Sequence, residues 1–84
     1  MSRHEKLYQH ILFRQSDANV PFEGLCALML RLGFNRRVRG DHHVFWREGV
    51  VEIVNLQPKG ASAKPYQVKQ VRELILRYGL RLEK

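Results

Sequence analysis

The stretch 36–46, which reads RRVRGDHHVFW, concentrates three arginines, two adjacent histidines and two aromatic residues. The unperturbed pKa of histidine lies near neutrality, so this side chain can both accept and donate a proton in a cell. Arginine carries a permanent charge on a planar fork that matches the geometry of phosphate. Proton transfer beside a held phosphate is the chemistry of RNA cleavage, so this stretch is our candidate site.

The charge of the whole chain favours a polyanionic partner. Fifteen Lys and Arg residues against eight Asp and Glu residues give a formal net charge of +7 at pH 7. The excess is uneven, with four arginines inside the stretch 36–47, and this clustering favours nucleic acid over a charge that serves only solubility. The candidate RNA-binding residues are Arg36, Arg37, Arg39, Arg47, Lys59 and Lys64.

Length and composition exclude several classes of protein. With 84 residues, 44% of them hydrophobic, the chain can form one small domain with a core and is not expected to be disordered. The single cysteine, Cys26, excludes an internal disulfide, and its apolar neighbours favour a buried thiol. We expect a cytoplasmic protein without a membrane segment or secretion signal. Because no His, Cys or acidic set has metal-ligand spacing, we expect neither a metal nor another cofactor.

Hydrophobic spacing predicts three helices. Ser2-Arg3-His4-Glu5 is typical of a helix N-terminus, and apolar residues at i,i+4 spacing continue to about Phe13. Pro21 suits the start of a second helix with an apolar stripe, and Gly33 suits its end. A last helix should begin at Pro65, and Gly79 should end it. We expect its buried face to hold Val68, Val71, Leu74, Ile75 and Tyr78, and its exposed face to hold Lys69, Arg72, Glu73 and Arg77.

Between the second and last helices, the pattern changes to short segments rich in β-branched and aromatic residues. The segments 36–39, 42–47 and 50–56 are separated by Gly40-Asp41 and Glu48-Gly49, and both dipeptides suit tight hairpin turns. A flexible loop is expected at 57–63. The predicted fold class is α+β, a single domain in which helices pack on one three-stranded antiparallel sheet.

Alternation along the second and third strands divides their residues between two faces. If Glu48-Gly49 is a two-residue turn, Arg47 pairs with Val50 and His42 reaches Asn55. One face then carries His42, Val44, Trp46, Val51 and Ile53, and the other carries His43, Phe45, Arg47, Val50, Glu52 and Val54. We expect the first face, the more apolar of these two sets, to lie against the helices. The apolar ring of Phe45 argues for the opposite facing, and a bulge would exchange the faces.

Residues from about Phe22 to Leu80 resemble the HicA family of toxin–antitoxin ribonucleases. The resemblance rests on Leu32-Gly33-Phe34, the basic strand, Gly40-Asp41-His42-His43-Val44-Phe45, and a helix that begins Lys64-Pro65-Tyr66-Gln67-Val68. It implies an α-β-β-β-α core over residues 20–82, like a double-stranded-RNA-binding domain. Residues 1–19 would be an added helical extension, and because they hold no candidate chemical group, we expect the core to act without them. The resemblance further implies an mRNA interferase that is neutralised by a HicB-like antitoxin.

The resemblance assigns the catalytic role to His42, the histidine of the family's Gly-Ser-His motif. Here Asp41 replaces the serine, and the second histidine that many members carry after the third strand is absent from the segment 55–58. RNA can be cut without a metal when its 2′-hydroxyl attacks the neighbouring phosphate, which requires a base, an acid and positive charge. His42 could serve as base or acid, with support from Asp41, Lys59, or His43 if a local bulge turns it to the same face.

Two other functions use the same basic surface. One is an RNA-binding module of the same fold without catalysis, which would recognise the shape of the RNA. The other is a protein-interaction domain that binds an acidic partner.

Overall fold

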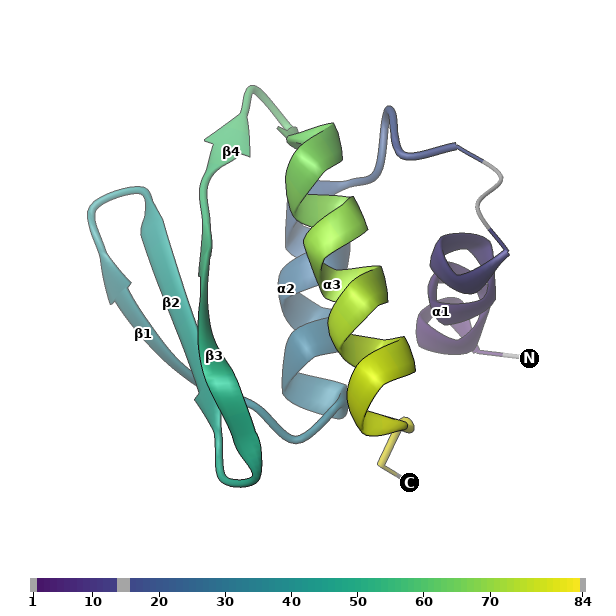
Figure 1. Ribbon diagram of the computed structural model, residues 1–84. Helices are drawn as coiled ribbons and strands as arrows, with labels where there is room; N and C mark the ends of the chain where they lie inside the picture. Colours follow the sequence, from purple (N-terminus) through teal and green to yellow (C-terminus); the bar gives the residue numbers. More distant parts are fainter. Residues whose placement is uncertain (1, 14–15, 84) are drawn as a thin grey trace.

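The computed structural model describes residues 2–13 and 16–83. Its elements follow the order α1 (Arg3–Leu12), α2 (Phe22–Arg31), β1 (Asn35–Arg39), β2 (His42–Arg47), β3 (Val50–Leu56), β4 (Pro58–Lys59), β5 (Ser62–Ala63) and α3 (Pro65–Tyr78). β1, β2 and β3 form an antiparallel sheet in that order, which confirms the α+β class. Figure 1 shows three layers, in which α2 and α3 lie between the sheet and α1.

The helix ends follow the local signals of the sequence. The Ser2 hydroxyl accepts the N–H of Glu5 at 3.2 Å and so caps the first turn of α1. α3 begins at Pro65 and is capped by Gly79, whose φ of 61° and ψ of 40° are left-handed values that glycine adopts without a side-chain clash. These local rules operate without tertiary contacts, and this explains why the sequence located the ends correctly.

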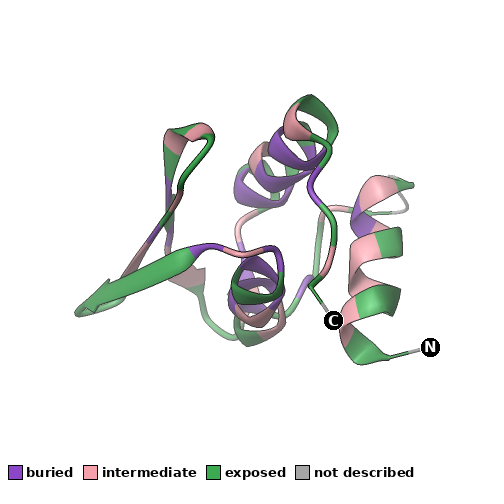
Figure 2. Ribbon diagram, turned by 90° about the horizontal axis from the view of Figure 1, so that it is seen from below, coloured by how far each residue is buried: buried purple, intermediate pink, exposed green. Residues whose placement is uncertain are grey.

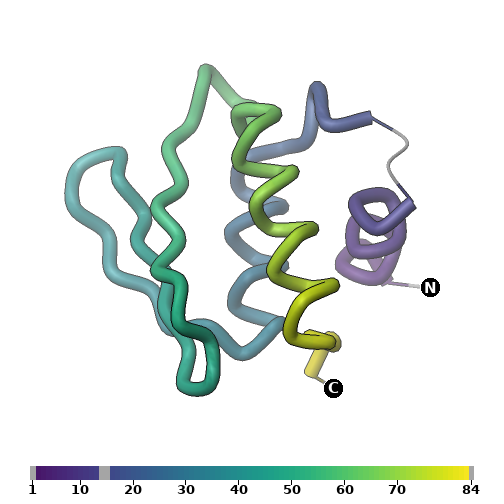
Figure 3. The backbone as a smooth tube through the Cα atoms, viewed as in Figure 1, coloured from purple at the N-terminus to yellow at the C-terminus, as the bar shows by residue number. Residues whose placement is uncertain are grey.

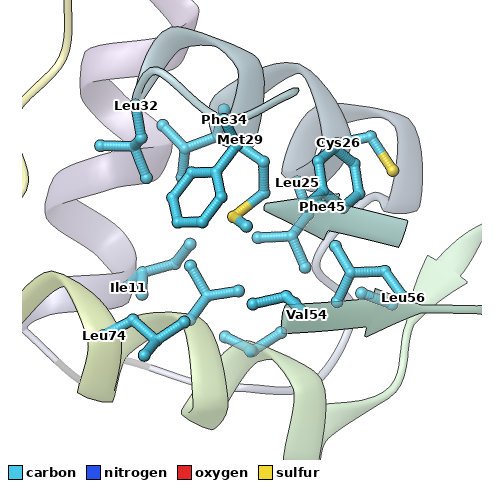
Figure 4. Packing of buried hydrophobic residues seen from close by; sticks show 14 of the residues in the cluster. Ile11, Leu25, Cys26, Met29, Leu32, Phe34, Phe45, Val54, Leu56 and Leu74 are labelled. Atoms are coloured by element: carbon cyan, nitrogen blue, oxygen red, sulfur yellow. The ribbon is translucent and has the colours of Figure 1, made fainter. Parts of the chain in front are cut away.

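One hydrophobic core joins all three layers (Figure 4). Ile11 of α1, Leu25 and Met29 of α2, Phe45 of β2 and Val54 of β3 are all fully buried in it. Figure 2 shows the same arrangement, with the buried stretches of α2 and α3 turned inward. Cys26 is buried as expected, and burial raises the pKa of its thiol to about 11. Among the described residues, no helix has the length and apolar character needed to cross a membrane.

The sheet presents the opposite face to the helices from the one we expected. Phe45 and Val54 pair across β2 and β3 and point into the core, whereas Val51 is 89% exposed, Ile53 66% and Trp46 41%. The predicted division of residues between the two faces is correct, and so is the Arg47–Val50 pair. The assignment of the buried face was wrong because Leu56 also belongs to the inner set. With that residue, the inner side buries the larger apolar area.

The N-terminal helix packs against the rest of the domain and contributes to its core. The Ile11 side chain is fully buried, and the Tyr8 hydroxyl donates to the Leu80 carbonyl at 2.6 Å. Arg72 of α3, which we expected to be exposed, is only 6% exposed. Its guanidinium donates to both carboxylate oxygens of Asp17, at 2.8 and 3.0 Å. Arg72 lies four residues after Val68 and therefore on the same stripe of the helix, so its position faces inward despite its charge.

The segment after β3 is a small hairpin and not the flexible loop that we expected. Pro58 pairs with Ala63 and Lys59 pairs with Ser62. The Ala63 N–H donates to the Val20 carbonyl at 2.8 Å, which ties this hairpin to the chain just before α2. Figure 3 shows the resulting path, in which the chain leaves the sheet, turns and enters α3 beside the start of α2. The turn-rich composition of the segment favoured a loop, and its bond to Val20 could not be predicted because Val20 lies far away in the sequence.

Candidate nucleic-acid interface at the β1–β2 turn

The turn between β1 and β2 determines where His42 lies. Arg39 pairs with His42, so Gly40 and Asp41 form a two-residue turn. Gly40 has a φ of 62°, a left-handed value that glycine alone adopts readily at the first central position of such a turn. His42 is therefore the first residue of β2, and its alternation places it on the open face of the sheet, away from the helices.

Four side chains form what we call the His42 cluster: Asp41, His42, Gln57 and Lys64. The imidazole is about half exposed, at 50%, and its Nε2 lies 3.7 Å from Oδ1 of Asp41. Nε2 of Gln57 lies 3.4 Å from Nε2 of His42 and donates to Oδ2 of Asp41 at 3.3 Å. Nζ of Lys64 donates to Oε1 of Gln57 at 3.4 Å. The histidine is thus open to a ligand on one side and ordered by polar groups on the other.

Gln57 reaches His42 through the register of β2 and β3. Val44 pairs with Asn55, so Gln57, two residues after Asn55, lies across from His42, two residues before Val44. We expected Asn55 itself opposite His42. A register shift between Phe45 and Arg47 moved that pairing by two residues and brought Gln57 to the histidine. Neither Gln57 nor its contact with Lys64 was anticipated, although an allowance for this shift would have placed Gln57 opposite His42.

The backbone of Gln57 is held by Gln67 of α3, which is almost completely buried. With its side-chain amide oriented to satisfy both groups, Gln67 donates to the Gln57 carbonyl at 3.1 Å and accepts the Gln57 N–H at 3.0 Å. Buried polar groups persist when they are hydrogen-bonded, and this pair satisfies four groups at once. The start of α3 and the end of β3 are thereby joined beneath the His42 cluster.

Two of the predicted phosphate-binding arginines share the open face with His42. Arg39 is its direct cross-strand partner, and Arg37 lies two residues away opposite Val44. Both arginines are exposed. Because cross-strand neighbours on one face lie close enough for their side chains to meet, the two guanidinium groups and the imidazole can act on one ligand.

The other predicted basic residues are distributed elsewhere. Arg36 pairs with Phe45 and so belongs to the opposite side of the sheet, at its edge. Arg47 is partly buried, and its guanidinium donates to the Leu32 carbonyl at 2.7 Å, where it caps the end of α2. Lys59 is exposed on the β4–β5 hairpin, and Lys64 belongs to the His42 cluster. The structure thus joins Arg37, Arg39 and Lys64 to the histidine and separates Arg36 and Arg47 from it.

His43 points to the inner side of the sheet, opposite to its neighbour His42. Its ring meets the ring of Phe22 in an edge-to-face arrangement, with centroids 4.9 Å apart and an interplanar angle of 79°. Its Nδ1 is buried and makes no hydrogen bond within residues 2–13 and 16–83. No bulge turns the ring toward the cluster, so the two histidines do not act on one ligand here.

The open face is apolar as well as basic. Trp46 and Ile53 are exposed beyond the arginines, and Val51 is almost fully exposed. No helix of the described chain covers this face, which Figure 1 shows on the side of the sheet away from α2 and α3. An exposed apolar group beside fixed positive charge is typical of a surface that binds another macromolecule.

The site lies on an open surface and not in a deep cleft. One well-formed hollow lies between α1 and the C-terminal segment, where Tyr8, Arg31 and Arg81 line it, and it includes no member of the His42 cluster. Within the described parts of the chain, no three His, Cys, Asp or Glu side chains are grouped to hold a metal ion. Comparison with protein-family models, with curated proteins and with solved structures finds no significant match.

Proposed function

We propose that this chain is a metal-independent endoribonuclease of the mRNA-interferase type, in which His42 is the general acid or base. One observation carries the proposal: a half-exposed imidazole lies beside the Asp41 carboxylate, on the same sheet face as Arg37 and Arg39. Cleavage through the 2′-hydroxyl needs a proton acceptor next to positive charge, and this face supplies both. An open face also suits a polymeric substrate better than a closed pocket does.

Each group has a distinct role in the proposed reaction. The His42 imidazole takes the proton of the 2′-hydroxyl, and the Asp41 carboxylate stabilises the imidazolium that forms. Arg39, its cross-strand partner, binds the phosphate that is attacked. Arg37 holds the next part of the backbone, and Trp46 offers a ring on which an unpaired base can stack.

We extend the proposal to the fold and family. Apart from α1 and the β4–β5 hairpin, the order α2-β1-β2-β3-α3 matches the α-β-β-β-α order of the HicA family and of double-stranded-RNA-binding domains. The histidine that follows a Gly-x turn at the start of β2 corresponds to the position of the family's catalytic histidine. A member of this family would be the toxin of a toxin–antitoxin pair.

The test is RNA cleavage by the purified protein in excess chelator. Wild-type protein should cut a long single-stranded RNA and leave 2′,3′-cyclic phosphate ends. His42→Ala should lower the rate by about 10²–10⁴-fold, the usual contribution of a general acid or base, and should still bind RNA. His4→Ala, on α1 at the other side of the helical layer, is the matched control and should cut normally.

Three outcomes contradict the proposal in different ways. Equal cleavage by a folded His42→Ala protein would remove His42 from the chemistry. Strict dependence on Mg²⁺ would replace the histidine mechanism by one in which the ion supplies the charge. Salt-dependent RNA binding with no cutting under any condition would identify the alternative, a non-catalytic RNA-binding module.

The composition of the open face also favours the binding of a HicB-like partner. A free ribonuclease would damage its own cell, so a protein that covers His42 is needed. Val51 and Ile53 supply exposed apolar area on the same sheet face as Arg37 and Arg39, and a partner with acidic and apolar groups fits that combination. Trp46 is the proposed anchor, since Phe45 is fully buried.

Binding to the product of the neighbouring reading frame tests this partner. Trp46→Ala should weaken the complex by at least about 30-fold, which corresponds to the ~2 kcal/mol that defines a hot spot. Tyr66→Ala, on the exposed side of α3, is the control and should leave the affinity unchanged. Equal affinity of the Trp46 variant and the control would place the interface elsewhere on the molecule.

A further inference from the structure

We propose that Gln57 is a positioning residue that determines the tautomer of His42, and that it makes Nε2 the ring nitrogen that accepts a proton. The inference deepens the function proposed above and rests on His42 acting in catalysis. The geometry of the His42 cluster carries it, because the two groups that flank the Gln57 amide can each bond in only one way.

The orientation of the Gln57 amide follows from its neighbours. The Lys64 ammonium has three donors and no acceptor, so the amide atom 3.4 Å from Nζ must be the oxygen. The ionised Asp41 carboxylate has only acceptors, so the amide atom 3.3 Å from Oδ2 must be the nitrogen. Both neighbours select the same orientation, and the reverse orientation would oppose donor to donor and acceptor to acceptor.

The orientation of the amide decides the tautomer of the ring. The Gln57 NH₂ group has two hydrogens, and one of them is directed to Asp41. The nitrogen lies 3.4 Å from Nε2 of His42, so the second hydrogen is directed to this ring atom. A ring nitrogen that accepts a hydrogen bond carries no proton, so the neutral imidazole must carry its proton on Nδ1.

Gln57 can perform this role because its own position is fixed. Its backbone is bound on both polar groups by the buried Gln67 side chain, at 3.0 and 3.1 Å. Its side chain is held by Lys64, which directly precedes α3. These three hydrogen bonds restrict Gln57 before any ligand arrives, which is the kind of support that keeps a functional side chain in its productive geometry.

The tautomer places the lone pair of Nε2 where a substrate can use it. The 3.4 Å contact is longer than a strong hydrogen bond, so a ribose hydroxyl can displace the amide. The 2′-hydroxyl proton then passes to Nε2 while O2′ bonds to phosphorus, and O5′ leaves with a proton from water. The new Nε2–H lies 3.7 Å from Oδ1 of Asp41, which stabilises the charged ring.

The experiment reads the tautomer directly, on the full-length protein without RNA. Long-range ¹H–¹⁵N correlation spectra of the ¹⁵N-labelled protein, recorded at a pH where His42 is neutral, distinguish protonated from unprotonated ring nitrogens. The wild-type ring should carry its proton on Nδ1. Gln57→Ala and Gln57→Glu should both convert it to the Nε2–H form, which free histidine prefers and which a carboxylate would accept.

Two further variants make the test specific. Lys64→Met removes one of the two groups that orient the amide and leaves Asp41 as the other, so it should convert only part of the ring population to the Nε2–H form. Asn55→Ala alters an exposed side chain two residues before Gln57 and should leave the wild-type spectrum unchanged. An Nε2–H ring in the wild type, or an unchanged tautomer in Gln57→Ala, would overturn the inference.

Cleavage measurements separate this inference from the proposed function. Gln57→Ala should cut RNA at least about tenfold more slowly with little change in RNA affinity, because a catalytic histidine in the wrong tautomer is impaired in the reaction and not in binding. The expected tautomer without cleavage by any variant would refute the function and leave the assignment of the ring proton standing. Cleavage that depends on His42 but is unchanged in Gln57→Ala would refute the positioning role alone.

Discussion

Asp17→Ala is expected to lower the free energy of unfolding by about 2–3 kcal/mol. The Arg72 side chain is only 7% exposed and depends on both oxygens of this carboxylate. Removal of one partner from a fully buried ion pair costs about 3–5 kcal/mol, and an exposed pair contributes about 0–1 kcal/mol. The Asp17 side chain is 27% exposed, so water can reach the remaining guanidinium and the cost should lie between these limits.

Urea denaturation followed by far-UV circular dichroism measures this change. With a urea dependence of about 1 kcal/mol per molar for a small domain, the midpoint should fall by about 2–3 M. Glu48→Ala, in the exposed β2–β3 turn, is the matched control and should change stability by less than about 0.5 kcal/mol. Arg72→Met in the Asp17→Ala background should recover much of the loss, because it removes the buried charge that was left unpaired.

A midpoint shift of Asp17→Ala no larger than that of Glu48→Ala would refute this reasoning. It would mean that the Arg72 charge is solvated in the folded protein and that the segment before α2 is not fastened to α3. If the large shift is found, deletion of residues 2–17 should unfold the chain, because it removes both Asp17 and the buried Ile11. Residues 20–82, which we expected to act alone, would then need the N-terminal helix in order to fold.

Three further predictions concern the sheet, its edge and the buried thiol. Phe45→Ala should cost about 3–5 kcal/mol of unfolding free energy and Trp46→Ala less than about 1 kcal/mol; comparable losses would contradict the facing of the sheet. A hydrogen bond from Tyr78 lowers the pKa of Glu52 below its ordinary value of 4.5. This stabilisation is complete above pH 4.5 and is lost as the pH falls through the lowered pKa. In Tyr78→Phe the urea midpoint should therefore fall less on acidification than it does in the wild type. Because burial raises the pKa of Cys26 from 9.0 to about 11, a thiol reagent at about pH 8 should label the native protein at least about a hundredfold more slowly than the unfolded protein; equal rates would show an accessible thiolate.

The sequence by itself determined the features that depend on neighbouring residues. The cap at Ser2, the start of α3 at Pro65 and its end at Gly79 are set by bonds within one turn of helix. The turn at Gly40-Asp41 and the division of strand residues between two faces are equally local, because φ preference and alternation act over a few residues. The candidate stretch around His42 could therefore be placed on a hairpin before any tertiary contact was known.

Tertiary structure alone decided which strand face is buried and what surrounds His42. The two faces hold apolar sets of similar size, so the choice depends on the total area that meets α2 and α3, to which Leu56 contributes. The charge of Arg72 predicts a surface position, and only the folded chain brings Asp17 from another segment to pair with it. Gln57 reaches the histidine only because the register of β2 and β3 shifts along the hairpin. Each outcome depends on residues far apart in the chain, where sequence spacing carries no information about distance in space.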